Sequence, residues 1–192
     1  GYLSLMSGLA TGAEKVYLNE EGITLAGLAA DSERMVESFR SGRSLYLVIR
    51  NERASVNYTT DVLAHIFAEE GKGLYDVREA ILGHQQQGGS PTAFDRIMAT
   101  KLVAHSLELL ACALKRGEPT ASYVGLMGGK VSDQPLDRMN DDLDRDHRRP
   151  RHQWWLGLRP AVGLVSQDIG TLTLQDVPDF GEAVDDAASD QR

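Results

Sequence analysis

The spacing of hydrophobic residues along the chain predicts helices that alternate with strands. Where apolar residues recur every three or four positions, the pattern is that of an amphipathic helix. Such helices are predicted at 3–10, 33–40, 59–70 and onward from Pro91. Shorter apolar runs, typical of strands, occupy 15–18, 44–49, 75–82, 123–127 and 130–136. The alternation predicts an α/β fold with a mainly parallel sheet flanked by helices.

The stretch 82–96, LGHQQQGGSPTAFDR, is the candidate functional segment. We expect it to follow a buried strand that ends at Leu82, and to lead into a helix with Ser90 as N-cap and Pro91 at the first position. Anions bind where a strand leads through a glycine-bearing turn to a helix N-terminus, because free N–H groups and the helix dipole point there. An ordinary surface turn has the same pattern, so these residues alone leave both interpretations open.

Composition and charge exclude several classes of protein. The net charge of −8 argues against a general nucleic-acid partner, and no uninterrupted apolar run predicts a membrane segment. A single cysteine, Cys112, excludes an internal disulfide and fits a reducing, cytoplasmic setting; we expect it to pack within a helix. The chain starts at Gly1 inside a helical pattern, which suggests a piece of a longer chain.

Four separated blocks resemble the ATP-dependent 6-phosphofructokinases, and specifically the C-terminal, regulatory half of their long eukaryotic-type subunit. The blocks are GYLSLMSGLATGAE at 1–14, RNERASVNYTTD at 50–61, EEGKGLYDVREAILGHQQQGGSPTAFDR at 69–96 and HRRPRHQWWLGLRP at 147–160. The resemblance implies a phosphofructokinase-type fold with two lobes per half, of which this chain holds an incomplete fragment. The expected parts are a partial sugar-phosphate or effector lobe at 1–90, a segment returning to the larger lobe at 91–125, C-terminal strands with a Trp-Trp helix at 126–165, and an acidic flexible tail at 166–192.

The resemblance also implies a function. The full-length enzyme would use ATP and Mg²⁺ to convert fructose 6-phosphate to fructose 1,6-bisphosphate in glycolysis. Its C-terminal half would bind fructose 2,6-bisphosphate as an allosteric effector. Carried over residue by residue, the effector site would consist of Glu52, Arg78, His84, Gln85, Gln86, Gln87 and Arg148.

The chemistry of these residues agrees with a sugar bisphosphate. Arg78 and Arg148 can each donate two hydrogen bonds to a phosphate, and Glu52 can accept from sugar hydroxyls. His84 and the three glutamines add further polar contacts. Three other arginines, at 145, 149 and 151, lie close to Arg148, so the choice among the four stays open.

The resemblance implies two features that separate the halves of the family: the residue at position 87 and the QWW block at 153–155, which belongs to the second half. At this turn the family's catalytic half has the motif H-x-Q-R-G-G, as the resemblance implies. This chain has Gln87 in place of the arginine. The family's glycine-rich ATP loop and catalytic aspartate segment have no counterpart here, so we expect no catalytic residue, no metal site and no kinase activity in this segment alone.

Two alternatives remain: a catalytic-half site for fructose 6-phosphate, or a mainly structural half that stabilises an oligomer. We expect the N-terminal part of the same chain and a homo- or hetero-oligomer as partners. Missing strands should leave sheet edges and helix faces uncovered, which predicts poor stability of the segment by itself.

Overall fold

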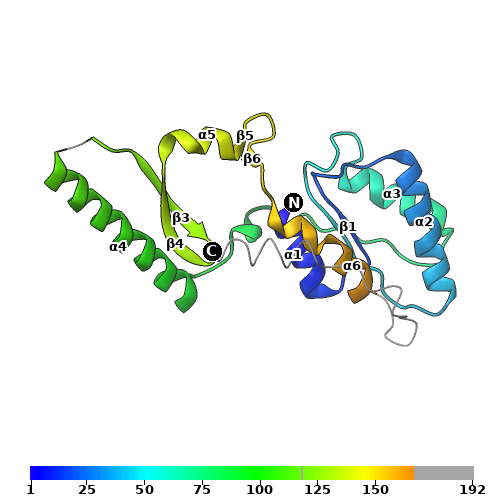
Figure 1. Ribbon diagram of the computed structural model, residues 1–192. Coiled ribbons are helices and arrows are strands. Elements are labelled where there is room, and N and C mark those ends of the chain that lie inside the picture. The colour runs from blue at the N-terminus through cyan, green and yellow to red at the C-terminus, as the bar shows by residue number, and fades with distance from the viewer. Residues whose placement is uncertain (118, 167–192) are drawn as a thin grey trace. The chain divides into compact units, whose positions relative to one another are not determined.

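The computed structural model describes residues 1–117 and 119–166, which form two compact units (Figure 1). The first unit comprises residues 1–82 and 155–166, and the second unit comprises residues 83–117 and 119–154. The predicted acidic tail lies outside the described residues apart from Ser166, and the lobe boundaries inferred from the resemblance remain predictions.

The first unit is built on a pair of parallel strands. Strand β1 (Lys15–Tyr17) pairs with β2 (Val48–Arg50), so that Val16 lies beside Ile49. Side chains on a strand point alternately to its two faces. Val16 therefore faces one apolar cluster and Tyr17 faces another, and the sheet separates two layers of the core.

Helices cover both faces of this strand pair (Figure 1). On the Val16 face lie α1 (Tyr2–Thr11), the 3₁₀ helix η3 (Trp154–Leu158) and α6 (Arg159–Val165). On the Tyr17 face lie α2 (Leu25–Arg40) and α3 (Thr60–Gly71). The buried residues of the first cluster are Leu5, Ala13, Val16, Leu18, Trp155 and Val162, and those of the second are Tyr17, Leu28, Met35, Ala54, Leu63 and Phe67.

Local sequence signals account for most helix ends in the first unit. Gly12 ends α1 in the left-handed conformation, with φ of 67°, as its position after the apolar stripe predicts. Thr59 caps α3 by accepting a hydrogen bond from the N–H of Val62. Helix α2 begins at Leu25, earlier than predicted, because Thr24 caps it by accepting from the N–H of Gly27.

The strand predicted at 75–82 is wrong, because no described strand pairs with this segment. The inward direction predicted for alternate side chains holds at Tyr75 and Val77. The ring of Tyr75 stacks on Phe39, with centroids 4.5 Å apart, and its hydroxyl donates to the carbonyl of Phe67 at 2.9 Å. Val77 packs against the same cluster. Ile81 and Leu82, expected to end a buried strand, are 82% and 60% exposed.

The second unit contains one long helix and two antiparallel hairpins. Its elements are η1 (Gly83–Gln87), α4 (Ala93–Arg116), β3 (Ser122–Met127), β4 (Lys130–Pro135), η2 (Leu136–Arg138), α5 (Met139–Asp142), β5 (Leu143–Asp144) and β6 (Arg149–Pro150). Strand β3 pairs with β4, as predicted, and β5 pairs with β6. Among the described residues the only parallel pairing is that of β1 with β2, so the parallel part of the α/β fold is small.

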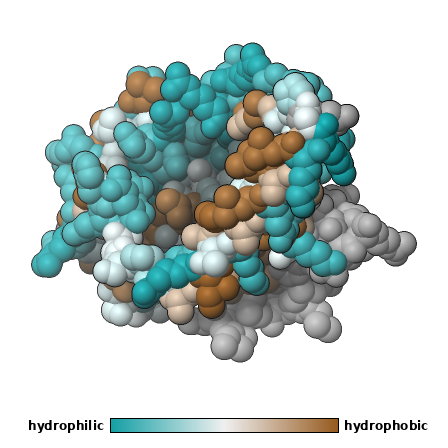
Figure 2. Space-filling model, turned by 90° about the vertical axis from the view of Figure 1, so that its left-hand side faces the viewer, coloured by the Kyte–Doolittle hydropathy of each residue, from teal (hydrophilic) through white to brown (hydrophobic). Residues whose placement is uncertain are grey.

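No described residue of the second unit is buried. Six large apolar residues of α4 are 55% to 74% exposed, namely Phe94, Ile97, Val103, Leu107, Leu110 and Leu114. Hydrophobic residues are visible among hydrophilic ones on the side of the molecule where α4 lies (Figure 2). Cys112, expected to pack inside this helix, is also exposed.

By length and composition α4 could cross a membrane, contrary to the expectation from the sequence. Three polar side chains argue for packing on protein instead. Lys101, His105 and Glu108 lie along the helix facing the β3–β4 hairpin, and His105 Nε2 is 2.9 Å from Asp133 Oδ1 on β4. A lysine at the centre of a membrane helix costs about 2.5–3.5 kcal/mol on insertion scales. This side of α4 therefore packs on the β3–β4 hairpin, as in a water-soluble protein helix against a sheet.

Candidate functional site

Glu52 lies in a turn directly after the carboxyl end of β2, where open α/β sheets place ligand contacts. Arg50 holds the start and the end of this loop together. Its Nε donates to the carbonyl of Tyr58 at 2.9 Å and its Nη2 to the carbonyl of Ser55 at 2.5 Å. Burial lowers the pKa of Arg50, and the nearby Glu52 carboxylate partly offsets this. The turn that carries Glu52 is thus fixed by hydrogen bonds, while Glu52 itself is exposed.

Arg78 follows the anchored residues Tyr75 and Val77 and is exposed. Since Tyr75 and Val77 pack inward, the alternate positions at 76 and 78 project away from the core. The guanidinium of Arg78 is therefore presented from an irregular segment that the core holds at one end. Although the predicted strand is absent, Arg78 still faces away from the core, as it would in a strand.

His84, Gln85, Gln86 and Gln87 form the 3₁₀ helix η1 in the second unit, and all four are exposed. The turn closes when the N–H of Gly88 donates to the carbonyl of Gln85 at 3.1 Å. Gly88 has φ of 80°, a conformation that other residues adopt only with strain. Gly88 is therefore needed for the backbone conformation of this turn.

The helix after this turn starts differently from the prediction. Ser90 is not the N-cap and Pro91 is not in the first turn, because Thr92 caps α4. Thr92 Oγ1 accepts from the N–H of Asp95 at 3.3 Å, and Asp95 Oδ2 accepts from the N–H of Thr92 at 2.7 Å. The hydrogen bonds from the Thr92 side chain and then its backbone lower the pKa of Asp95. A carboxylate of the chain itself thus lies at the positive end of α4, and the anion site suggested by the sequence at this N-terminus stays a prediction.

Arg148 lies in the four-residue connection between β5 and β6 and is exposed. Its φ is 54°, which is uncommon for a residue with a side chain. Asp144, at the end of β5, accepts from the backbone N–H of His147 at 3.2 Å and lies 2.8 Å from His147 Nδ1. These hydrogen bonds, with the backbone one largest, lower the pKa of Asp144.

The seven predicted residues are divided between the two units. Glu52 and Arg78 belong to the first unit, whereas 84–87 and Arg148 belong to the second. Within the described part of the chain, the side chains of all seven are exposed and form no hydrogen bond or ion pair. Each unit by itself therefore carries exposed polar groups that could bind a phosphorylated sugar.

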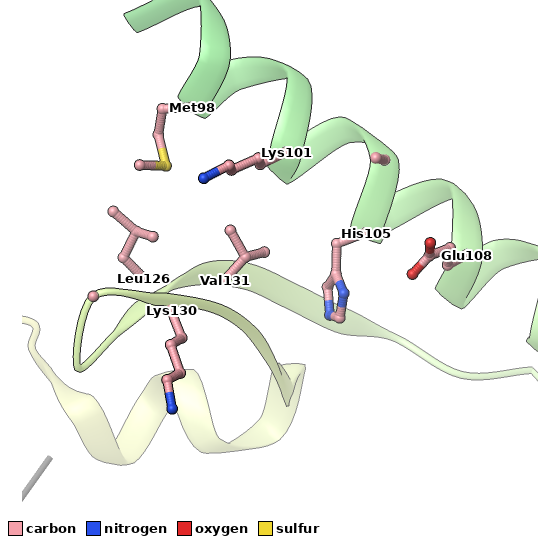
Figure 3. Close-up of a pocket in the computed structure, with 9 residues that line it drawn as sticks. Met98, Lys101, His105, Glu108, Leu126, Lys130 and Val131 are labelled. Atoms are coloured by element: carbon pink, nitrogen blue, oxygen red, sulfur yellow. The ribbon is translucent and has the colours of Figure 1, made fainter. Parts of the chain in front are cut away.

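Two polar clusters were not predicted from the sequence. In the second unit, a cavity of about 430 Å³ lies between α4 and the β3–β4 hairpin (Figure 3). Lys101 and His105 reach into it from the helix, and Leu126 and Val131 face it from the hairpin. His105 and Asp133 lie 28 residues apart in the sequence, and no local motif marks them as a pair.

The other cluster is buried in the first unit around Asp31, whose side chain is 3% exposed. Its Oδ2 accepts from the hydroxyl of Tyr17 at 2.7 Å and is 2.9 Å from Lys15 Nζ, while its Oδ1 is bound by Arg34. Burial and then the bond to Asp31 raise the pKa of Tyr17. The one sequence signal for this cluster is a carboxylate on the inward side of α2, in a segment that was not assigned to the helix.

Comparison with known families identifies the chain. The phosphofructokinase family model matches residues 1–110, more than half of the sequence. The chain belongs to the phosphofructokinase family. This confirms the phosphofructokinase resemblance and the α/β fold class that it implied, while the placement in the C-terminal half stays a prediction.

Individual members of the family agree with this assignment. The chain is 38% identical over 177 residues to the muscle-type ATP-dependent 6-phosphofructokinase of Canis lupus familiaris and 42% identical over 178 residues to the ATP-dependent 6-phosphofructokinase of Dictyostelium discoideum. These matches cover 87% and 92% of this chain, but only 23% and 21% of those proteins.

Solved structures give the same result. Phosphofructokinase from Saccharomyces cerevisiae matches with a TM-score of 0.80 and 32% identity, over 86% of this chain and 23% of that chain. Phosphofructokinase from Pichia pastoris in the T-state matches with a TM-score of 0.76 and 29% identity, over 91% of this chain and 21% of that chain. This phosphofructokinase segment therefore spans less than a quarter of the length of these relatives.

Proposed function

We propose that this chain is part of the C-terminal half of an ATP-dependent 6-phosphofructokinase and carries its site for fructose 2,6-bisphosphate. The full-length enzyme would phosphorylate fructose 6-phosphate in cytoplasmic glycolysis, with ATP and Mg²⁺ bound by other parts of the polypeptide. Family membership and the names of the relatives support the reaction.

Gln87 is the observation that carries the regulatory assignment. In the family's catalytic half, the resemblance implies an arginine at the position of Gln87. Gln87 lies exposed in the η1 turn. A glutamine donates and accepts hydrogen bonds but brings no charge. Phosphoryl transfer requires positive charge on the reacting phosphoryl group, whereas a site that only holds its ligand does not require a cation at this particular position. The alternative, a catalytic site for fructose 6-phosphate, would need that charge.

The remaining residues supply what a sugar bisphosphate requires. Arg78 and Arg148 provide charge for phosphate oxygens, since a guanidinium can donate two parallel hydrogen bonds to them. Glu52 accepts from sugar hydroxyls, and the hydrogen bonds of Arg50 hold its turn in place. His84 and the glutamines of η1 contribute neutral donors and acceptors.

The rest of the phosphofructokinase polypeptide is the partner that the second unit needs. Its described residues contain no buried side chain, and the apolar residues of α4 are mostly exposed. Many exposed large apolar residues on one helix are typical of a surface that other protein covers. Since the segment spans less than a quarter of its relatives, we infer that other parts of the same chain cover α4, within an oligomer of such subunits.

Kinetics of the full-length enzyme test the regulatory assignment. Arg78→Ala should raise the effector concentration for half-maximal activation about 10- to 150-fold, because a hydrogen bond to a charged group contributes roughly 1.5–3 kcal/mol. The control is Arg40→Ala, which removes an exposed arginine from α2 and should leave activation unchanged. Unchanged activation in Arg78→Ala would overturn the assignment.

A further inference from the structure

The hairpin that carries Arg148 has an unusual backbone. Asp144 and Arg149 face each other as the last pair of β5 and β6, and residues 145–148 connect them. Arg148 is one of two described residues other than glycine with a positive φ, the second being Lys72 at the end of α3. A residue with a side chain keeps this conformation only where surrounding interactions hold it. The positions around Arg148 must therefore include groups that compensate for it.

Asp144 supplies these interactions. One carboxylate oxygen accepts from the backbone N–H of His147, the residue immediately before Arg148, at 3.2 Å. The other oxygen is 2.8 Å from His147 Nδ1 and 3.6 Å from Arg149 Nε, immediately after Arg148. The carboxylate therefore holds the residues on both sides of Arg148. Asp144 is itself only partly exposed, so water competes less well for these bonds than at an open surface.

The same contacts distinguish among the four neighbouring arginines. Arg145 donates to the side chain of Asn140, and Arg149 pairs with Asp144. Among described residues the guanidinium groups of Arg148 and Arg151 have no such partner. Arg151 continues the strand direction through its backbone N–H, which donates to the carbonyl of Asp142 at 2.8 Å. Only Arg148 combines an unpaired guanidinium with a backbone that is held in a special conformation.

We propose that Asp144 is a positioning residue that, by binding His147 and Arg149, presents the Arg148 guanidinium to a phosphate of the effector. This inference rests on the proposed function, because it assigns a task to Arg148 within that site. Holding the turn in advance lowers the conformational entropy that the arginine loses when the phosphate binds. Asp144 itself, as an anion, does not contact the phosphate.

The test uses the full-length enzyme and fructose 2,6-bisphosphate. Asp144→Ala should raise the effector concentration for half-maximal activation about three- to tenfold, since hydrogen bonds change affinities by factors of this size. The increase should exceed any change in KM for fructose 6-phosphate. Asp144→Asn, which keeps an acceptor for the His147 N–H, should show a smaller increase. Asp146→Ala is the control, because this carboxylate lies in the same connection, is exposed and makes no hydrogen bond or ion pair with described residues.

A double-mutant cycle of Asp144 and Arg148 shows whether Asp144 acts through Arg148. If Asp144 acts through Arg148, the double variant Asp144→Ala/Arg148→Ala should be no weaker than Arg148→Ala alone. Additive effects, or normal activation in Asp144→Ala while Arg148→Ala loses its response, would overturn this inference and leave the proposed function standing. A normal response in Arg78→Ala and Arg148→Ala together would instead overturn the proposed function. If Asp144→Ala does not fold, Asp144→Asn carries the same comparison.

Discussion

Removal of the buried carboxylate of Asp31 should destabilise the first unit more than any surface change. Asp31→Ala leaves the Tyr17 hydroxyl without its acceptor and Lys15 without its counter-ion. Removing one partner from a buried ion pair costs about 3–5 kcal/mol. We expect the lower end, about 3 kcal/mol, because the side chain of Lys15 is 24% exposed and that of Arg34 is 60% exposed, so both can be hydrated.

A double-mutant cycle isolates the bond between Tyr17 and Asp31. Tyr17→Phe alone should cost about 1.5 kcal/mol, the lower value for a hydrogen bond to a charged group, because Asp31 keeps two cationic partners. Once Asp31 is alanine, the hydroxyl has lost its acceptor, so removing it should cost about 1 kcal/mol less. Glu33→Ala is the control: it removes an exposed carboxylate two residues away on α2 and should change stability by about 0.5 kcal/mol at most.

Hydrogen exchange of the full-length enzyme, followed by mass spectrometry, is the suitable assay. A multidomain protein has no single free energy of unfolding, whereas exchange reports local opening of β1 and α2. Peptides from 15–18 and 25–40 should lose protection in Asp31→Ala and keep it in Glu33→Ala. A cost below about 1 kcal/mol, or Asp31 and Tyr17 effects that add within about 0.3–0.5 kcal/mol, would refute the role assigned to this cluster.

Two further predictions concern packing. Gly8→Ala should destabilise the first unit by about 1–3 kcal/mol, because a Cβ there would lie 2.4 Å from Cγ2 of the buried, stiff Val16 side chain. Gly163→Ala in α6 should instead stabilise the unit by up to about 1 kcal/mol, because a Cβ there meets nothing within 4 Å. Hydrogen exchange of peptides from β1 and α6 in the full-length variants compares the two. The segment expressed alone should show rapid amide exchange throughout α4, since the second unit has no buried described residue; cooperative protection of α4 in the isolated monomer would contradict this.

Helices with clear local signals were predictable from the sequence. The end of α1 at Gly12 and the start of α3 after Thr59 follow from one capping residue each. The early part of α2 was not predicted, because its inward face includes the polar residues Asp31 and Ser32, which a hydrophobic pattern does not detect. The burial of Asp31 depends on Tyr17 and Lys15, which are distant in sequence.

Predictions that depended on a partner segment did worse. Residues 75–82 have the composition of a strand, yet a strand exists only where another strand accepts its hydrogen bonds. The start of α4 was misplaced for a different reason. Thr92 and Asp95 have the spacing of a capping box, and this signal outweighs the Ser90-Pro91 pair that was chosen.

The candidate site was predictable in its residue types and not in its arrangement. All seven residues are exposed and polar, as a binding role requires. Which of the neighbouring arginines is available follows from contacts such as Asp144 with Arg149, and these depend on the register of β5 and β6. A register of two short strands leaves no mark in the hydrophobic pattern.

The capping of α4 by Asp95 has a consequence for how this turn can evolve. With a carboxylate at the positive end of the helix, recognition of an anion beside it depends more strongly on side chains. Side chains can be exchanged without rebuilding a backbone, and glutamine and arginine codons differ by a single base. A change at position 87 alters the charge of an exposed turn whose backbone depends on Gly88. After a gene duplication, such a turn can be assigned to a new ligand in one mutational step while the fold around it is inherited intact.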